Sequence, residues 1–263
     1  TNATYTLTQA DVGTLITVTA SYTDGHGFAE SVTSDSTATV ENVNDLPTGT
    51  VTIAGTTRED EILTASNNLA DEDGLGEIGY QWHRNGAVID GATSATYTLT
   101  QADVGSTIAV EVRYTDQQGT AEISTSAATD AVVNVNDIST GTVTISGTAT
   151  EDEILTAANN LADEDGIAGN ISYQWNRGGN AINGATATTY TLTQRDVGEA
   201  ITVTASYTDG EGTAESVTSA ATPAVANVND APVGTVTISG TTTEDQTLTA
   251  SNDLADEDGL GAI

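Results

Sequence analysis

Apolar and polar side chains alternate along most of this chain with a period of two residues. Ile108, Val110, Val112 and Tyr114 fall on one face of an extended segment, and the residues between them fall on the other. This alternation is typical of β-strands, whose successive side chains point to opposite faces of a sheet. Threonine and valine, which favour strands, are plentiful, and helix formers at helical spacing are missing. The pattern predicts an all-β chain.

The alternating pattern repeats about every 92 residues. The string Tyr-Thr-Leu-Thr-Gln begins at Tyr5, Tyr97 and Tyr190, and the second interval is longer because of one extra residue just before Tyr173. Such a period is too long for a solenoid turn and long enough for each repeat to have its own core. With the string Asn-Val-Asn-Asp as the linker, we expect a partial repeat of late strands at 1–45, whole repeats at 46–137 and 138–230, and a partial repeat of early strands at 231–263.

Turn residues divide the repeat 46–137 into short strands. Asp73-Gly74, Asn85-Gly86 and similar pairs are turn signals between the alternating stretches. About seven strands in a repeat of this length predict a two-sheet antiparallel sandwich. The expected strands cover 49–55, 61–68, 77–84, 87–89, 96–101, 107–115 and 120–133.

Charge and composition narrow the choice of partners. The chain has 38 acidic and 5 basic residues, for a formal net charge of −33. Such a surface repels nucleic acid and anionic membranes and attracts cations. No apolar run approaches the roughly 18 residues of a membrane helix, so we expect no insertion into a membrane by this stretch. Cysteine is absent, which removes disulfides and thiolate chemistry. Methionine is absent too, and we expect that the sequence is part of a longer chain.

Two segments resemble those of immunoglobulin-like domains. Residues 80–86, Tyr-Gln-Trp-His-Arg-Asn-Gly, look like strand C, whose tryptophan packs between the sheets, and residues 97–105 look like strand E and the E–F turn. The near-identical repeats, the acidic bias and the Asn-Val-Asn-Asp junctions resemble the extender repeats of giant bacterial surface adhesins of the repeats-in-toxin type. The resemblance implies a linear tandem array of immunoglobulin-like sandwiches, located outside the cell at the bacterial surface.

Acidic and amide residues recur at every junction of the repeats. Calcium takes oxygen ligands from carboxylates, amides and backbone carbonyls, so loops dense in Asp and Asn suit it. In an immunoglobulin-like sandwich the B–C and F–G loops lie at the end where the chain enters, facing the linker. The linker also resembles cadherin-like calcium joints. We therefore predict interdomain Ca²⁺ at three successive junctions, with the ligands Asn44, Asp45, Asp71, Glu72, Asp73 and Asp116, then Asn136, Asp137, Asp163, Glu164, Asp165 and Asp209, then Asn229, Asp230, Asp256 and Asp258.

The A–B and E–F loops of the preceding repeat are expected to approach each junction from the other side. At the second junction these loops carry Glu59-Asp60-Glu61 and Asp103, and at the third they carry Glu151-Asp152-Glu153 and Asp196, with Glu257 added from the following repeat. The alternative is that all these acids are solvated turn residues. Their recurrence at each junction favours calcium over that alternative.

Candidates for other chemistry are weak. The only histidines, His26 and His83, are replaced by other residue types in the other repeats, so we interpret them as surface residues. The aromatic residues Tyr80 and Trp82 share the inward parity and are interpreted as core rather than as a sugar-binding platform. Carboxylate pairs recur in polar turns, which does not favour glycosidase catalysis. Threonine at alternate positions is interpreted as the solvent face of strands rather than as an ice-binding surface.

These observations together predict a non-enzymatic, mechanical role. An active site is needed once, whereas a spacer is needed many times. We expect an extracellular extender or stalk of a large bacterial adhesin, stiffened by calcium between its domains. The expected partners are neighbouring repeats of the same chain and other copies of the chain. The alternative is a segment of an extracellular structural filament or sheath that neighbouring chains complete.

Overall fold

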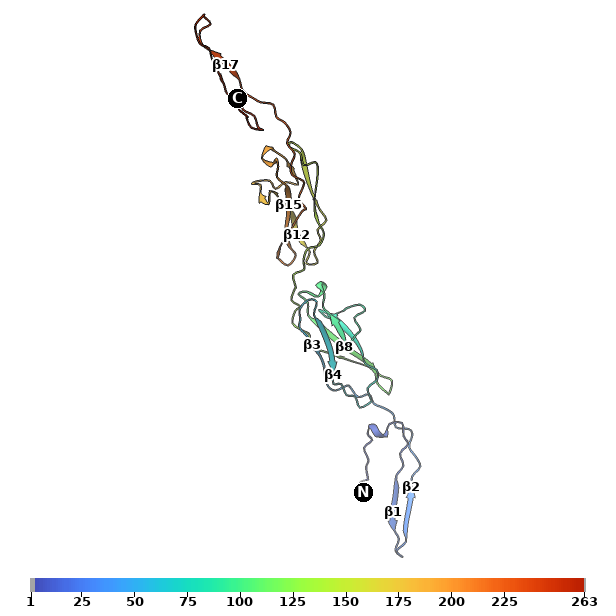
Figure 1. Cartoon of the computed structure of the whole chain (residues 1–263). Helices are drawn as coiled ribbons and strands as arrows, with labels where there is room; N and C mark the ends of the chain where they lie inside the picture. Colours follow the sequence, from blue (N-terminus) through green and yellow to red (C-terminus); the bar gives the residue numbers. More distant parts are fainter. Residues whose placement is uncertain (1–2, 263) are drawn as a thin grey trace. The chain divides into compact units, whose positions relative to one another are not determined.

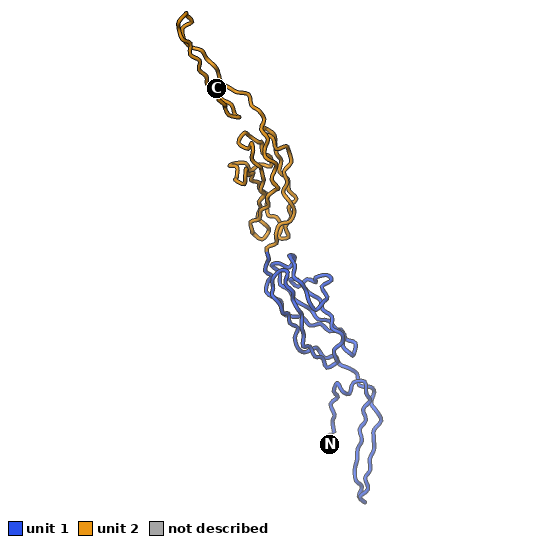
Figure 2. Tube along the Cα trace, in the orientation of Figure 1, with its two compact units in different colours: residues 1–135 blue, residues 136–263 orange. Residues whose placement is uncertain are grey.

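The computed structural model describes residues 3–262. The chain divides into two compact units, residues 1–135 and 136–263 (Figure 2). Each unit contains one seven-stranded sandwich and one separate two-stranded hairpin. Residues 1–2 and 263, at the outer ends of the expected partial repeats, lie outside the described residues, and the division into four repeats stays a prediction.

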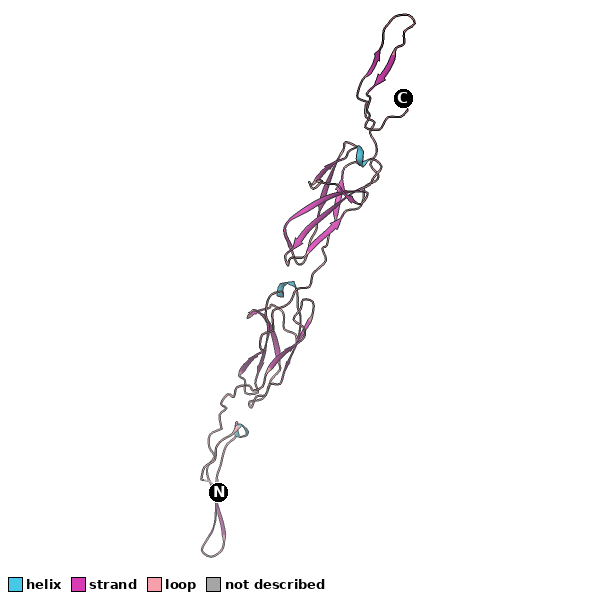
Figure 3. Cartoon of the chain, turned by 90° about the vertical axis from the view of Figure 1, so that its left-hand side faces the viewer, coloured by secondary structure: helices cyan, strands magenta, loops and turns pink. Residues whose placement is uncertain are grey.

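The sandwich of unit 1 consists of two antiparallel sheets, whose strands are drawn in Figures 1 and 3. One sheet has the order β3-β4-β7, formed by Val51–Ala54, Ile62–Asn67 and Thr96–Thr98. The other has the order β6-β5-β8-β9, formed by Ala87–Val88, Gly79–Arg84, Ile108–Thr115 and Ala121–Thr125. The all-β antiparallel sandwich predicted from the sequence is therefore confirmed, and a regular strand lies within each of the seven expected spans.

The core lies between the two sheets of this sandwich. Trp82 on β5 is fully buried and stacks on Tyr97, with 5.7 Å between ring centroids. Its indole nitrogen donates to the carbonyl of Ser94 at 2.9 Å, so its polar group is satisfied. Along β8 every second residue is buried, beginning with Ile108. The interpretation of Trp82 and of the alternating apolar positions as core is confirmed.

The last expected strand, 120–133, is regular only as far as Thr125, which corrects the prediction. Beyond this residue the hydroxyls of Ser126 and Thr129 accept hydrogen bonds from the amides of Val110 and Ile108, each at 3.0 Å. Side chains thus replace part of the backbone ladder along β8. Residues 132 and 133 then form parallel bridges with Val104 and Arg58.

The sandwich of unit 2 has the same topology. Its sheets are β10-β11-β14, formed by Val143–Ser146, Ile154–Asn159 and Thr189–Thr191, and β13-β12-β15-β16, formed by Asn180–Ala181, Ile167–Arg177, Ile201–Asp209 and Ala214–Thr218. The register of β12 against β15 shifts between Ala168 and Ser172. This irregularity holds the extra residue of the second repeat, as β-bulges do.

Each unit also contains a two-stranded hairpin with an exposed apolar face. In unit 1 it is formed by β1 (Thr19–Thr23) and β2 (Ala29–Thr33), and in unit 2 by β17 (Val236–Ser239) and β18 (Thr249–Asn252). Tyr22 and Val236 are exposed here, whereas their counterparts in the complete sandwiches, Tyr114 and Val143, are buried.

Short 3₁₀ turns precede the long strand of each late half-repeat. They are η1 (Gln9–Asp11), η2 (Gln101–Asp103) and η3 (Gln194–Asp196). Among the described residues there is no helix with the length and apolarity needed to cross a membrane.

Candidate metal centre

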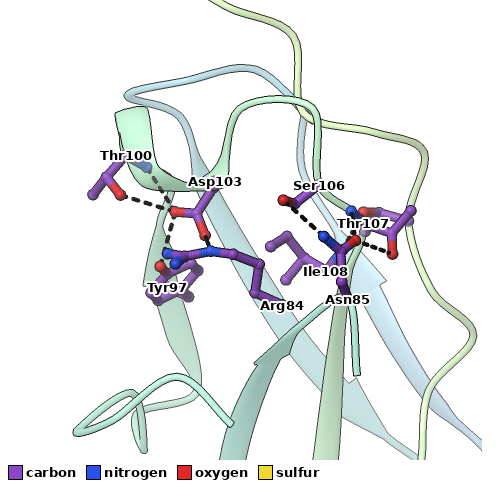
Figure 4. A network of polar contacts seen from close by, with 9 residues as sticks. Arg84, Asn85, Tyr97, Thr100, Asp103, Ser106, Thr107 and Ile108 are labelled. Carbon is purple, nitrogen blue, oxygen red and sulfur yellow. Dashed lines mark hydrogen bonds and ion pairs between the residues drawn. The ribbon is translucent and has the colours of Figure 1, made fainter. Parts of the chain in front are cut away.

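A buried ion pair fixes the turn η2 against the sandwich (Figure 4). Asp103 is fully buried, and its carboxylate accepts hydrogen bonds from Arg84 Nε at 2.7 Å, the Tyr97 hydroxyl at 2.8 Å and the Thr100 amide at 2.9 Å. Burial alone would raise the pKa of Asp103, but the hydrogen bonds from Arg84 and Thr100 outweigh burial and lower it. The carboxylate is therefore fully engaged inside the fold, so Asp103 is removed from the expected junction ligands.

The same network recurs in unit 2 around Asp196. Arg177 Nε lies 2.6 Å from its carboxylate, and the Tyr190 hydroxyl and the Thr193 amide also donate to it. Asp196 is thus removed from the expected ligands for the same reason. In both units the network anchors the 3₁₀ turn, whose first residue is a glutamine: Gln101 in η2 and Gln194 in η3.

Gln194 lies beside a buried carboxylate of the A–B turn. Glu151 is only 3% exposed, and its Oε2 accepts a hydrogen bond from the Val228 amide at 3.2 Å. With its amide nitrogen turned toward Glu151, Gln194 donates to both carboxylate oxygens, at 2.7 and 2.9 Å, and to the Asn227 side-chain oxygen at 3.2 Å. Three oxygen-bearing side chains therefore converge at this end of the sandwich.

The matching residues in unit 1 are Glu59, Gln101 and Asn134. Glu59 is 2% exposed, and it accepts a hydrogen bond from the Val135 amide at 3.2 Å. The side-chain oxygens of Gln101 and Asn134 are buried and have no hydrogen-bond partner. Because a buried oxygen without a donor is costly, these two oxygens fit a bound cation.

Three carboxylates gather at the linker within unit 2. Glu151, Asp230 and Glu257 each offer an oxygen, and these oxygens lie within 4.8 Å of one another. The Asp230 amide donates to Asp258 at 2.9 Å, which ties the linker to the following hairpin. Unscreened carboxylates this close repel one another, and a divalent cation with oxygen ligands relieves that repulsion.

The first linker makes the same backbone contact within unit 1, together with two further side-chain contacts. The Asp45 amide donates to Asp73 Oδ2 at 2.8 Å, and Gln9 Nε2 donates to Asp73 Oδ1 at 2.8 Å. Asn44 donates to the Glu122 carboxylate at 2.8 Å. The structure therefore brings the predicted residues Asp45 and Asp73 together, whereas Asn44 contacts Glu122, which was not among the predicted residues.

Tyr114 links the other predicted residues of this end of the sandwich. Its hydroxyl donates to Asp71 at 2.6 Å. Burial, that hydrogen bond and the charges of Asp71, Glu122 and Asp116 raise its pKa above the ordinary value. Asp116 is 5% exposed; its Oδ1 accepts two backbone hydrogen bonds in the F–G turn, while its Oδ2 is buried without a partner. Glu72 is exposed to solvent.

Unit 2 repeats this arrangement at its own linker. The Asp137 amide donates to Asp165 Oδ2 at 2.8 Å, and the Tyr207 hydroxyl donates to Asp163 at 2.6 Å. Asp165 Oδ1 and Asp209 Oδ2 are buried and have no hydrogen-bond partner. The remaining predicted residues lie nearby in their loops: Asn136, which donates to Glu215 at 3.1 Å, the exposed Glu164, and, at the third linker, Asn229 and Asp256, which contact Asp230 and Asp258 respectively.

Several polar residues at these linkers were missed from the sequence. Glu122 and Glu215 lie in strands β9 and β16, at the same position of each repeat. The sequence contained a signal for them, a charged residue at an alternating position whose side chain points into the fold. In the structure Glu122 is accordingly only 6% exposed. The amides of Gln101 and Gln194 were missed because they belong to a string that was interpreted only as strand and turn.

Comparisons with known proteins give little further information. No protein-family model and no curated protein matches the chain. Among solved structures, the chain is similar to one described as a Ca²⁺-stabilized adhesin that helps an Antarctic bacterium reach out and bind ice, with 17% sequence identity and a TM-score of 0.30. The match covers 87% of this chain and 60% of that structure's chain. At this identity and TM-score, the likeness carries no conclusion about this chain.

Proposed function

We propose that this chain is part of a non-catalytic extracellular extender, the stalk of a large bacterial surface adhesin, and that Ca²⁺ at the linkers stiffens it. The observation that carries the proposal is the repetition of the linker chemistry together with the fold. Asp45 and Asp137 make the same backbone contact to Asp73 and Asp165 in the two units. A spacer requires such repetition, whereas a catalytic site does not.

The donor set supports calcium over other metals. In unit 2 the ion would be held by Glu151, Asp230 and Glu257, with the amide oxygens of Gln194 and Asn227 close by. Carboxylate and amide oxygens are the ligands of calcium, whereas structural zinc prefers histidine and cysteine. A bound ion would join the linker to the sandwich before it and to the hairpin after it.

The overall charge supports an extracellular setting. A net charge of −33 keeps the chain away from nucleic acid and from anionic surfaces. Calcium in extracellular modules binds with dissociation constants on the order of 10⁻⁴–10⁻³ M, so sites of this kind fill outside the cell. The stiff state of the stalk would therefore form after export.

The test compares the whole chain in millimolar calcium, in chelator and in sodium chloride of equal ionic strength. We expect calcium to raise the melting temperature and to slow hydrogen exchange of the Val228 and Asp230 amides, which donate to Glu151 and Asp258. Glu151→Gln should weaken both effects. Glu153→Gln is the matched control, because Glu153, although expected at this junction, is exposed and is not one of the three gathered carboxylates. If sodium produces the same changes, the acids are a solvated coat and the calcium proposal fails.

A further inference from the structure

A glutamine begins each of the three 3₁₀ turns of the described residues, η1, η2 and η3. Gln9 Nε2 donates to Asp73 at 2.8 Å within unit 1. Gln194 faces Glu151 within unit 2. Gln101 has a buried side-chain oxygen without a partner. A primary amide has a donor end and an acceptor end of nearly equal size, so it can serve either a carboxylate or a cation at the same position.

The two orientations of Gln194 suit two different states of the linker. With its nitrogen toward Glu151, the amide donates three hydrogen bonds, at 2.7, 2.9 and 3.2 Å, to Glu151 and Asn227. With its oxygen toward Glu151, the same distances separate oxygens that have no proton between them, and the amide nitrogen faces only donors. A cation satisfies the oxygen side of this second arrangement, because it attracts all four oxygens at once.

The fold fixes the position of the Gln194 backbone. The turn η3 is anchored by Asp196, which is fully buried and paired with Arg177. The backbone of Gln194 is thereby held at the linker. Rotation about the terminal side-chain bond remains available, because such bonds to planar groups have broad, roughly two-fold energy profiles.

We infer that the side-chain amide of Gln194 takes one orientation without a bound cation and the opposite orientation with one. This inference rests on the calcium site proposed above. In the ion-free linker its amide nitrogen donates to Glu151 and keeps the carboxylate satisfied. When a cation binds, the amide turns over and its oxygen becomes a ligand. Because the cation must displace these hydrogen bonds, the Gln194 amide lowers the affinity of the site for the cation. The same hydrogen bonds keep the ion-free linker ordered.

The primary test follows the side-chain NH₂ group of Gln194 by nuclear magnetic resonance in the ¹⁵N-labelled whole chain. In chelator we expect the NH₂ protons to be protected from exchange, and titration with calcium should shift the signal and remove the protection. The internal control is Gln174, whose NH₂ donates to the carbonyls of Trp175 and Ile182 and should not respond. If the Gln194 signal is unchanged while the Asp230 amide becomes protected, the amide does not turn over and this inference is wrong, whereas the proposed calcium site is supported. If neither signal responds, the calcium site itself fails.

Substitutions separate the donor role from the ligand role. Gln194→Lys keeps a donor for Glu151 and cannot bind a cation, so it should retain the melting temperature in chelator and lose the calcium response at this linker. Gln194→Leu removes both roles, so the melting temperature in chelator should fall and calcium affinity should drop roughly tenfold. Gln194→Glu should bind calcium more tightly and be the least stable in chelator. If the lysine and leucine variants behave alike in chelator, the donor role is wrong.

Discussion

Buried aspartates have two different roles in this chain. Asp103 has both oxygens engaged by Arg84, Tyr97 and Thr100, and it lies inside the fold. Asp116 is almost as buried, yet one of its oxygens has no partner. The first arrangement stabilises the sandwich, and the second is available to a ligand. Burial alone does not distinguish the two.

Removing Arg84 should destabilise unit 1 much more than removing an exposed arginine. Arg84→Ala leaves the charge of Asp103 buried without its cation, and we expect a loss of about 2–3 kcal/mol. The matched control is Arg113→Ala, because the side chain of Arg113 is 55% exposed and its partner Glu111 still contacts water with 14% of its side chain, whereas the side chain of Asp103 has no exposed surface. This control should change stability by less than about 0.5 kcal/mol. Hydrogen exchange of the β5 and β8 amides in urea measures both; equal effects would contradict the assigned role of Asp103.

The sequence could predict the acidic linker residues but not how the fold would use each one. The strings around Asp73 and Asp45 recur together, and the immunoglobulin-like topology predicts that they meet, as they do. Asp103 also recurs, so recurrence gave no reason to separate it from the linker set. Its removal depends on a long-range pair with Arg84 across the sandwich, and a pattern of neighbouring residues does not contain that information.

At the scale of elements, strand β9 ends early because, beyond Thr125, side-chain hydroxyls accept the hydrogen bonds that amides of the neighbouring strand β8 donate. Ser126 and Thr129 accept hydrogen bonds from β8 in unit 1, and Ser219 and Thr222 do so from β15 in unit 2. The sequence predicted a strand to residue 133, since serine and threonine also occupy the solvent faces of strands. The sequence pattern is the same whether a hydroxyl faces solvent or accepts a hydrogen bond from a neighbouring strand. Only the position of that neighbouring strand distinguishes the two cases.

Replacing Thr129 with valine should show that its hydroxyl stabilises the sandwich. The two side chains have similar shape, so Thr129→Val chiefly removes the acceptor of the Ile108 amide. Because that amide lies on a strand whose alternate residues are buried, we expect a loss of about 1–2 kcal/mol, measured by urea unfolding. Thr125→Val, at an exposed position on β9, is the control and should be close to neutral. A neutral result for Thr129→Val would mean that water replaces the hydroxyl.

At the scale of the whole molecule, the apolar contacts of the two sandwiches form separate cores. One cluster includes Leu63 and Trp82 in unit 1, and the other includes Leu155 and Trp175 in unit 2. Each core contains only residues of its own unit. The sandwiches should therefore fold as separate units, whose number can change without loss of the others, as the proposed extender role requires.

Truncating one core residue should affect one unit only. Leu155 is fully buried, so Leu155→Ala should cost about 3 kcal/mol and lower the melting temperature of unit 2 by roughly 15 °C. Calorimetry of the whole chain in chelator should then resolve two transitions, with the higher one unmoved. Leu63→Ala is the matched variant in unit 1, and hydrogen exchange should show that it shifts the other unit instead. A single transition that falls as a whole in both variants would mean that the cores unfold together, and independent addition of repeats would lose its physical basis.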